Sequence, residues 1–447
     1  MNLNLPYPEN NLQVLTEPVV IHWFRRDLRL YDNQALKLAS HREMQILPIF
    51  IFDPEILDSL EKDDKRVSFI FQALKYLDID LAQKGSYIRK YAGNPADVIE
   101  RLTDLYSVKA VFTNHDYEPY AQKRDCSIRD LLLRKGIEFI TCKDQVIFEK
   151  EDIVKNDGTP YTVFTPYSSK WKSMFEPSLS DENSSLTSNR DIFLKGSAKT
   201  TFTLDFVGFK EVKGVFKAPI INEELIARYD QTRNFPAIGT SHLGVHLRFG
   251  TISIRHLVSR TFRLNSTWLG ELQWREFFMQ ILWHYPYVVN KPFKAQYERI
   301  LWRNDEGDFQ KWCFGETGYP LVDAGMRELL QTGVMHNRVR MVTASFLTKH
   351  LLIDWRWGES WFAQKLLDFE LASNNGNWQW SAGCGCDAAP YFRIFNPRAQ
   401  ADKFDPDNLY VKRWIPEFNT SKYPKPIVDH NLARNRCLEA YSAVRTT

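Results

Sequence analysis

The chain has 447 residues, of which 44% are hydrophobic and 25% are charged, so it can bury a large core, and its length favours two or three domains. The formal net charge of +3 at pH 7 is only mildly basic, which excludes nucleic-acid binding driven by overall charge and leaves a local basic patch as the route to it. Aromatic residues make up 14% of the chain and include 13 Trp, which indicates stacking or electron-carrying roles beside ordinary core packing.

The first 150 residues alternate apolar runs with helical patterns. Between the apolar runs, apolar residues at helical spacing predict helices over 68–84 and 95–106. This alternation favours a doubly wound parallel sheet, which is a Rossmann-like α/β domain over residues 1–150. No G-x-G-x-x-G follows the first strand, where Arg25–Leu30 stands instead, so a nicotinamide site is disfavoured. The predicted strands are 19–24, 44–53, 110–116 and 137–144.

The composition then changes twice. Residues 151–215 are rich in Ser, Thr, Lys, Asp and Gly with little periodicity, which predicts a connector between domains. Beyond 216 the patterns are long and amphipathic with few strand signals, so residues 216–447 are predicted to form an all-helical domain. Its clearest helical patterns lie at 271–286, 319–333 and 337–355.

Two of these helices place polar and aromatic side chains on one face. At spacings of three and four, Glu271, Trp274 and Arg275 share a face of the first. On another helix Asn337, Arg340 and Met341 share a face, and Arg338 is turned toward another wall. Core helices do not normally carry such faces, which therefore suggest a binding site. Exposed charges beside ordinary packing are the alternative for either helix alone.

The segment Gly239–Gly244 places hydroxyl groups directly before an amphipathic stretch. Thr240 or Ser241 at a helix start can cap backbone N–H groups, and the same helix end can hold a diphosphate. Simple capping is the more common explanation for this pattern taken alone.

Residues 368–397 form the most unusual run of the chain, a dense mixture of amides, glycines, aromatics and arginines. Asn374, Asn375 and Asn377 are weak helix formers and are costly to bury unless their amides find partners, so a tertiary contact or a ligand must justify them. The run has no Ser elbow, His–Cys pair or carboxylate pair suited to acyl or glycosyl transfer. Redox chemistry on a bound cofactor is therefore predicted.

The six cysteines are scattered, and the sequence has no signal peptide and no apolar run as long as about 18 residues. These features predict free thiols, a cytoplasmic location and no membrane association. Cys384 and Cys386 form a C-x-C pair without a second pair at zinc spacing, so no metal site is predicted.

Taken together, these segments resemble the photolyase/cryptochrome family, in the same order along essentially the whole chain. Within this family the pattern looks most like a class I cyclobutane pyrimidine dimer DNA photolyase. The resemblance implies an α/β antenna domain followed by a helical domain that binds FAD and DNA. The pieces that carry it are 23–36, 240–253, 269–278, 317–359 and 368–397.

The resemblance implies that a U-shaped FAD lies in the helical domain, with an amide facing flavin N5 and a carboxylate pairing with an arginine beside the ring. His242 and Gly244 stand where Arg and Ser are common, and Glu370 is one methylene longer than the usual Asp. The matched cofactor-binding residues are Tyr229, Thr240, Ser241, His242, Leu243, Gly244, Arg275, Asn337, Arg340, Asp368, Glu370 and Asn374.

The resemblance also implies the reaction. Excited reduced FAD donates an electron to a dimer flipped out of the duplex, the cyclobutane ring opens, and the electron returns. Glu271 matches the carboxyl that hydrogen-bonds a thymine carbonyl, and Trp274 and Trp380 match the aromatics that flank the flipped bases. The residues matched to the lesion or the DNA backbone are Met341, Arg338, Arg393, Arg398 and Gln400, and those matched to an electron-hopping chain are Trp378, Trp355 and Trp302.

Several alternatives stay open. A cryptochrome-like photoreceptor would share the fold, although no long tail follows the helical domain. A (6-4) photolyase is disfavoured because Asn337 and Met341 stand where those enzymes usually carry His, and no DASH-type pattern is evident. Glu118 resembles an antenna-contact position, with a folate, a deazaflavin or an empty site as the options. UV-damaged DNA is the expected partner, and a monomer is the expected state.

Overall fold

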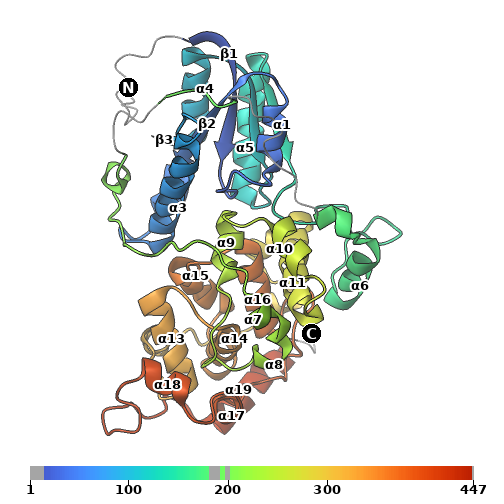
Figure 1. Cartoon of the computed structure of the whole chain (residues 1–447). Helices are drawn as coiled ribbons and strands as arrows, with labels where there is room; N and C mark the ends of the chain where they lie inside the picture. The colour runs from blue at the N-terminus through green and yellow to red at the C-terminus, as the bar shows by residue number, and fades with distance from the viewer. Residues whose placement is uncertain (1–14, 181–191, 197–201, 445–447) are drawn as a thin grey trace. The chain divides into compact units, whose positions relative to one another are not determined.

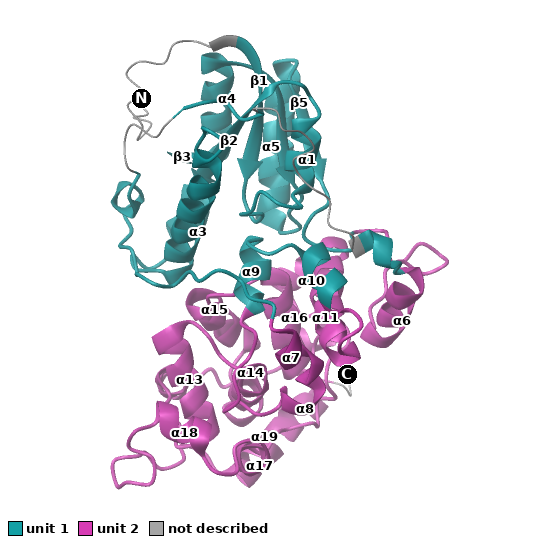
Figure 2. Cartoon of the chain, in the orientation of Figure 1, with its two compact units in different colours: residues 1–149, 175–221, 243–260 teal, residues 150–174, 222–242, 261–447 magenta. Residues whose placement is uncertain are grey.

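The computed structural model of the chain describes residues 15–180, 192–196 and 202–444 (Figure 1). Contacts divide the chain into two compact units, each built from separate stretches of sequence (Figure 2). The first unit contains residues 1–149, 175–221 and 243–260, and the second contains residues 150–174, 222–242 and 261–447. Among the described residues, no helix is long and apolar enough to cross a membrane.

The first unit is built on a parallel sheet in the order β3-β2-β1-β4-β5. The central strand β1 pairs on both edges, so that Ile21 lies opposite Leu47 on one side and Val111 on the other. Central strands of this kind are buried on both faces, which explains their nearly continuous apolar sequences. The strands are β1 Leu15–Phe24, β2 Gln45–Phe52, β3 Arg89–Ala92, β4 Tyr106–Asn114 and β5 Glu138–Cys142.

The helices of this unit begin where the sequence offers a cap. Asn33, Asp64 and Asn94 each accept a hydrogen bond from a backbone N–H in the first turn of the helix that follows. Pro95 and Pro119 occupy first-turn positions that need no N–H donor. The α-helices are α1 Gln34–Ser40, α2 Pro54–Leu57, α3 Lys65–Ala82, α4 Pro95–Leu105, α5 Pro119–Arg134, α9 Leu243–Phe249 and α10 Ile254–Thr261, with short 3-10 turns at η1 Pro177–Ser180 and η2 Leu204–Val207.

The predicted α/β fold class is confirmed, and one strand is additional to the prediction. β3 has four residues, two of them charged, and therefore carries no apolar run. It is recognisable only through its pairing with β2, in which Ile49 lies opposite Arg89.

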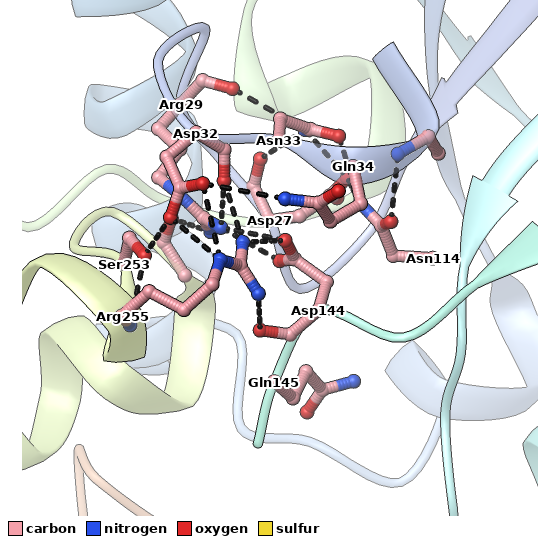
Figure 3. A network of polar contacts seen from close by, with 12 residues as sticks. Asp27, Arg29, Asp32, Asn33, Gln34, Asn114, Asp144, Gln145, Ser253 and Arg255 are labelled. Atoms are coloured by element: carbon pink, nitrogen blue, oxygen red, sulfur yellow. Dashed lines mark hydrogen bonds and ion pairs between the residues drawn. The ribbon is translucent and has the colours of Figure 1, made fainter. Parts of the chain in front are cut away.

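A buried network of polar side chains joins residues 253–255 to the loop after β1 (Figure 3). Arg29 donates to both oxygens of Asp144 at 2.8 Å, and Arg255 donates to the same carboxylate at 2.7 Å. Arg255 also donates to the two oxygens of Asp32 at 2.9 and 3.0 Å, and Ser253 donates to Asp32 as well. The four charged side chains are all buried, and charges in such places are stable only when they are paired.

A glycine allows this close approach. Gly250 has a φ of +63°, and a Cβ there would lie 2.0 Å from the carbonyl oxygen of Arg26. The backbone of Leu28 donates to the carbonyl of Phe249 at 3.1 Å beside it. Part of the motif at 23–36, which carries the family resemblance, therefore contacts residues 249–250, far later in the sequence.

This network predicts that the first unit is acid-sensitive. Burial alone would raise the pKa of Asp144, but Arg29 and Arg255 outweigh it and hold the pKa below its usual value. A carboxyl whose folded pKa is depressed contributes stability above its unfolded pKa and loses it as the pH falls through the folded value. We expect the amide hydrogens of β1 and α10 to lose protection, relative to their intrinsic exchange rate at each pH, below about pH 4, as measured by hydrogen–deuterium exchange. The exposed carboxyl of Asp130 provides the control, because Asp130→Asn should leave this acid dependence unchanged.

The second unit is helical throughout its described residues apart from loops and an isolated bridge. Its α-helices are α6 Phe164–Met174, α7 Glu223–Ala227, α8 Tyr229–Thr232, α11 Ser266–His284, α12 Glu306–Phe314, α13 Pro320–Thr332, α14 Asn337–Ser345, α15 Trp355–Lys365, α16 Leu371–Ala382, α17 Pro397–Phe404, α18 Leu409–Trp414 and α19 His430–Ala443. Its short elements are the 3-10 turns η3 Pro286–Val289 and η4 Ala295–Arg299 and the π-helical turn η5 Phe346–His350.

The sequence pattern over 337–355 is interrupted in the structure. α14 runs into the π-helical turn η5 and then stops, because Leu352 adopts a positive φ of 51°. Asp354 then accepts a hydrogen bond from the backbone N–H of Arg356 and starts α15. The change of direction separates the side chains of α14 from those of α15, and both helices contribute to the cavity described below.

The predicted connector, residues 151–215, contains a helix that periodicity did not indicate. α6 buries only Tyr167, Ser168 and Trp171, too few apolar positions for a clear pattern. The structure assigns α6 to the second unit, and residues 175–215 to the first. Residues 181–191 and 197–201 of the predicted connector lie outside the described residues.

Candidate functional site

A cavity in the second unit collects many of the predicted site residues. The cavity and its mouth hold about 600 Å³ of space. Its walls come from α14, from the end of α15, and from the segment Asp368–Ser381 that includes α16. The lining includes Asn337, Arg340, Met341, Phe362, Asp368, Glu370, Asn374, Trp378 and Trp380.

Arg340 and Asp368 form an ion pair in the wall of this cavity. One terminal nitrogen of Arg340 donates to both carboxylate oxygens at 3.0 and 2.9 Å, and its Nε donates to the carbonyl of Met335 at 2.8 Å. Both side chains are a little more than one quarter exposed, so the pair is oriented while one side stays accessible. Such a pair presents both a positive and a negative group to a ligand.

Asn374 is held in one orientation by Glu359. Its amide nitrogen donates to the Glu359 carboxylate at 2.8 Å and to the Glu359 carbonyl at 3.1 Å. With both amide hydrogens committed to Glu359, the carbonyl oxygen is the group that Asn374 offers to the cavity. Burial raises the pKa of Glu359, and the hydrogen bond from Asn374 opposes this shift.

Glu370, whose extra methylene left its role open, forms an ion pair in the structure. Arg275 on α11 donates to it at 3.2 Å, and the Ser373 hydroxyl donates to its other oxygen at 2.8 Å. The carboxylate therefore joins α11 to the start of α16, beside the cavity. Removing either partner of such a buried pair destabilises the protein, because the remaining buried charge is left uncompensated.

Glu271 lies one turn before Arg275 on α11 and is held by a separate group of residues. It pairs with Arg233 at 2.7 Å and accepts a hydrogen bond from Tyr229. Burial raises the pKa of Glu271, while Arg233 and Tyr229 lower it, and the net shift is upward. A carboxyl with a raised pKa is more readily protonated, and so can become a hydrogen-bond donor when a ligand removes it from water.

The two predicted stacking residues, Trp274 and Trp380, have different surroundings. Trp380 lines the cavity, and the guanidinium of Arg393 lies 5.9 Å from its ring centre. One face of Trp274 is covered by Phe164, whose ring is nearly parallel to it. Trp274 does not line the cavity.

Of the three predicted electron-carrying tryptophans, Trp378 and Trp355 belong to one hydrophobic core cluster, Trp302 packs against that cluster, and only Trp378 lines the cavity. Trp378 is buried and packs edge-on against Trp312 and Phe362, at 6.1 and 5.0 Å between ring centres. Trp355 is buried at the first position of α15, and Trp302 is partly buried and contacts Tyr441.

Gly358 makes room for Trp378. A Cβ at Gly358 would lie 2.1 Å from the Trp378 ring and 2.5 Å from Leu347. We therefore expect Gly358→Ala to lower the free energy of unfolding by about 1–3 kcal/mol, the usual cost of overpacking. In Gly270→Ala, the matched control on α11, the new Cβ meets nothing within 4 Å, so stability should not fall. Urea unfolding measures both, and equal stability of the two variants would contradict the expectation.

The loop Thr240–Gly244 crosses from the second unit to the first between His242 and Leu243. His242 has a φ of +52°, a left-handed conformation that is uncommon for a side chain other than Gly. Thr240 is exposed, and Leu243 and Gly244 open α9. Thr240, Ser241 and His242 do not line the cavity.

The basic residues predicted to contact DNA are partly engaged within the protein. Arg338 donates to Asn234 at 2.5 Å and lies over the ring of Phe404, 4.5 Å from its centre. Arg393 and Arg398 are exposed, and Gln400 is partly buried on α17. In the first unit, Glu118 is paired with Arg26 at 3.1 Å and with Arg248 at 2.7 Å.

Sequence reasoning did not single out Glu359, Arg233, Asn234 or Phe164 as site residues. Each acts on a predicted site residue from 15 or more positions away, so no local spacing indicates it. Charge complementarity was the one available signal, and only for Arg233, which is opposite in charge to Glu271; the Asn374 amide that Glu359 holds is neutral.

Comparisons with known proteins identify relatives of the chain. A family profile described as DNA photolyase matches residues 20–184, and one described as FAD binding domain of DNA photolyase matches residues 268–422. The chain is 36% identical to a deoxyribodipyrimidine photo-lyase of Synechococcus sp., over 95% of this chain and 97% of that protein.

Two solved structures resemble the whole chain. A bacterial class III photolyase from Agrobacterium tumefaciens is 33% identical, with a TM-score of 0.82, covering 97% of this chain and 98% of that one. An archaeal photolyase from Sulfolobus tokodaii with two FAD molecules is 32% identical, with a TM-score of 0.81, covering 95% of this chain and 100% of that one.

Proposed function

The chain belongs to the DNA photolyase family, and on this premise we propose that it is a deoxyribodipyrimidine photolyase, which uses light to split cyclobutane pyrimidine dimers in UV-damaged DNA. The observation that carries the proposal is the cavity in the second unit. It brings together an oriented Arg–Asp pair, a fixed amide, a buried Trp and a more accessible Trp from α14, α16 and the segment just before α16.

The residues of this cavity fit FAD. The Arg340–Asp368 pair offers charged hydrogen-bonding groups to the polar edge of a flavin ring, and the Asn374 carbonyl oxygen is free to accept a hydrogen bond from a protonated N5. When bound, reduced FAD supplies the light-driven electron that opens the cyclobutane ring, and it recovers that electron afterwards.

We assign the remaining roles to the residues of the chain as follows. Asn374 favours the reduced cofactor, because its fixed carbonyl accepts rather than donates a hydrogen bond. Trp378 delivers electrons that restore this state, and we assign Trp355, in the same core cluster, and Trp302, which packs against that cluster, to the same electron supply. Glu271 binds a pyrimidine carbonyl, which its raised pKa makes easier because a protonated carboxyl can donate.

DNA binding is proposed to use the exposed arginines and two aromatic rings. Flipping a dimer out of the duplex costs on the order of a few kcal/mol, and stacking on Trp380 and contact with Trp274 and Met341 offset this cost. Arg393 and Arg398 are exposed and free to approach phosphates, so binding should weaken as salt increases. Arg338 is held by Asn234 and Phe404 and therefore presents a preset orientation.

We also propose a second, light-harvesting chromophore in the first unit, a cytoplasmic location and a monomeric state. The Sulfolobus tokodaii photolyase holds two FAD molecules, which supports the second chromophore. All six cysteines are free thiols, which is consistent with a reducing compartment. An absorption spectrum and a sedimentation measurement on the purified protein test the chromophores and the monomer.

The decisive experiment is repair itself. The purified protein is reduced, mixed with an oligonucleotide that contains one thymine dimer, and illuminated with blue light, and the restored thymines are counted by chromatography. We expect repair only in the light and only with the reduced protein. A protein that holds reduced FAD but restores no thymine under illumination would exclude the repair function and favour a photoreceptor instead.

A further inference from the structure

Phe164 covers one face of Trp274 in a parallel stack. The ring centres are 3.7 Å apart and the ring planes differ by 8°. Phe278, one turn along α11, lies at 5.3 Å from Trp274 with a tilt of 31°, and Phe277 meets it edge-on at 5.5 Å. Trp274 is therefore held in a single orientation by aromatic neighbours, and the face under Phe164 is closed to any ligand.

Phe164 is the first residue of α6, and a hydrogen bond fixes its backbone. Its backbone N–H donates at 2.9 Å to the carboxylate of Asp387, in the loop that follows α16. An acidic partner at a helix start is favourable, since the first N–H groups of a helix have no partner within it. Phe164 therefore lies between α11, which carries Trp274, and the loop that follows Trp380.

Two buried hydrogen bonds fix α6 on α11. Ser168 donates to the side-chain oxygen of Gln273 at 2.7 Å, and Trp171 donates to the carboxylate of Glu276 at 2.6 Å. Residues 164, 168 and 171 lie on one face of α6 at helical spacing, and their partners on α11 are Trp274 itself and the nearby residues Gln273 and Glu276. α6 therefore supports the ring of Trp274, a role that the sequence of α6 did not indicate.

From this geometry we propose that Phe164 is a positioning residue for recognition of the lesion, a role that rests on the proposed photolyase function. By closing one face of Trp274 and fixing its orientation, Phe164 leaves a single surface of Trp274 for the flipped dimer. The stacked pair is already formed before DNA arrives, so the ring need not be ordered on binding. Phe164 therefore increases the preference for damaged over undamaged DNA without touching the reacting atoms.

The test measures binding in the dark, to a duplex with one thymine dimer and to the same duplex without damage. Phe164→Ala is expected to lower affinity for the dimer duplex about tenfold, within the range of one aromatic stack, and to leave affinity for the undamaged duplex unchanged. Phe164→Tyr, which keeps the ring, should restore the preference. The flavin absorption of each variant should match that of the original protein.

Two further variants supply a second test of the Phe164 ring and a control for the loss of an aromatic side chain. Phe164→Leu fills much of the same space without an aromatic face, so it decides the question if Phe164→Ala does not fold, and it should lose most of the preference. Phe418→Ala removes another partly buried ring of the second unit, one that contacts Tyr423, and should change neither affinity. A Phe164→Leu protein with the original preference, or an equal loss for both duplexes, would overturn the proposal.

Failure of the proposed function is distinguishable from failure of this inference. Repair is measured separately, in the light, on the unaltered protein. An unaltered protein that prefers dimer DNA but repairs none would refute the photolyase assignment, while the binding comparison among the Phe164 variants would still decide the positioning role.

Discussion

Replacing Trp378 by Phe is expected to slow light-driven reduction of oxidised FAD by about 100-fold, which corresponds to about 2.7 kcal/mol of activation free energy. Trp378 is the one predicted electron carrier that both lines the cavity and lies in the hydrophobic core. A phenyl ring fills most of the same space against Phe362 and Gly358 but is much harder to oxidise than an indole. The absorbance of oxidised flavin under blue light, with a thiol reductant present, gives the rate.

The same variant separates electron supply from repair. Once it has been reduced chemically, Trp378→Phe should repair dimers at the original rate, because Trp378 supplies electrons and does not bind the lesion. Trp283→Phe is the matched control, since Trp283 is a partly buried tryptophan of α11 that contacts Glu151. Rapid photoreduction by the Trp378 variant would show that another residue is the first donor.

Replacing Glu359 by Leu is expected to make the reduced cofactor about tenfold faster to oxidise in air, the effect of losing one partner of a buried amide. Glu359 accepts one of the two amide hydrogens of Asn374 through its carboxylate and the other through its backbone. Without the carboxylate, the Asn374 amide can rotate and present its N–H₂ group to the cavity. A donor at that position opposes a protonated N5 and favours the oxidised ring.

Glu359→Gln tests the orientation argument directly. Its side-chain carbonyl can still accept from Asn374, so the oxidation rate and the midpoint potential should stay close to those of the original protein. Both quantities are read from flavin absorbance during air oxidation and redox titration. If the Leu and Gln variants behave alike, the charge of Glu359 and not its hold on Asn374 controls the cofactor.

The sequence predicted the fold well where local signals and long-range packing agree. Residues 19–24 of β1 and most of β2 are apolar runs, and helices such as α4 start at an Asn cap followed by Pro. β3 was missed because four residues with two charges carry no pattern outside their pairing with β2. α6 was missed because its contacts with α11, rather than its own periodicity, make it a helix.

The candidate site was predictable only in part, for a related reason. Helical spacing was enough to group Asn337, Arg340 and Met341, which all line the cavity. It could not reveal that Glu359 orients Asn374 or that Phe164 covers Trp274, because those contacts join separate helices. Family resemblance named the residues that meet ligands, and the structure adds the ones that hold them in place.

The buried ion network around Asp144 also constrains how the protein forms as it is synthesised. Arg29 and Asp144 are synthesised early, but Arg255 follows Asp144 by more than 100 positions. Until Arg255 has been synthesised, Asp32 lacks the arginine with which it pairs in the folded protein. Pairings between distant positions are slow to form, because a long loop must close before they contribute. All five strands have been synthesised once β5 is complete, whereas the buried ion network also needs Ser253 and Arg255, which follow the second unit's first helices in the sequence.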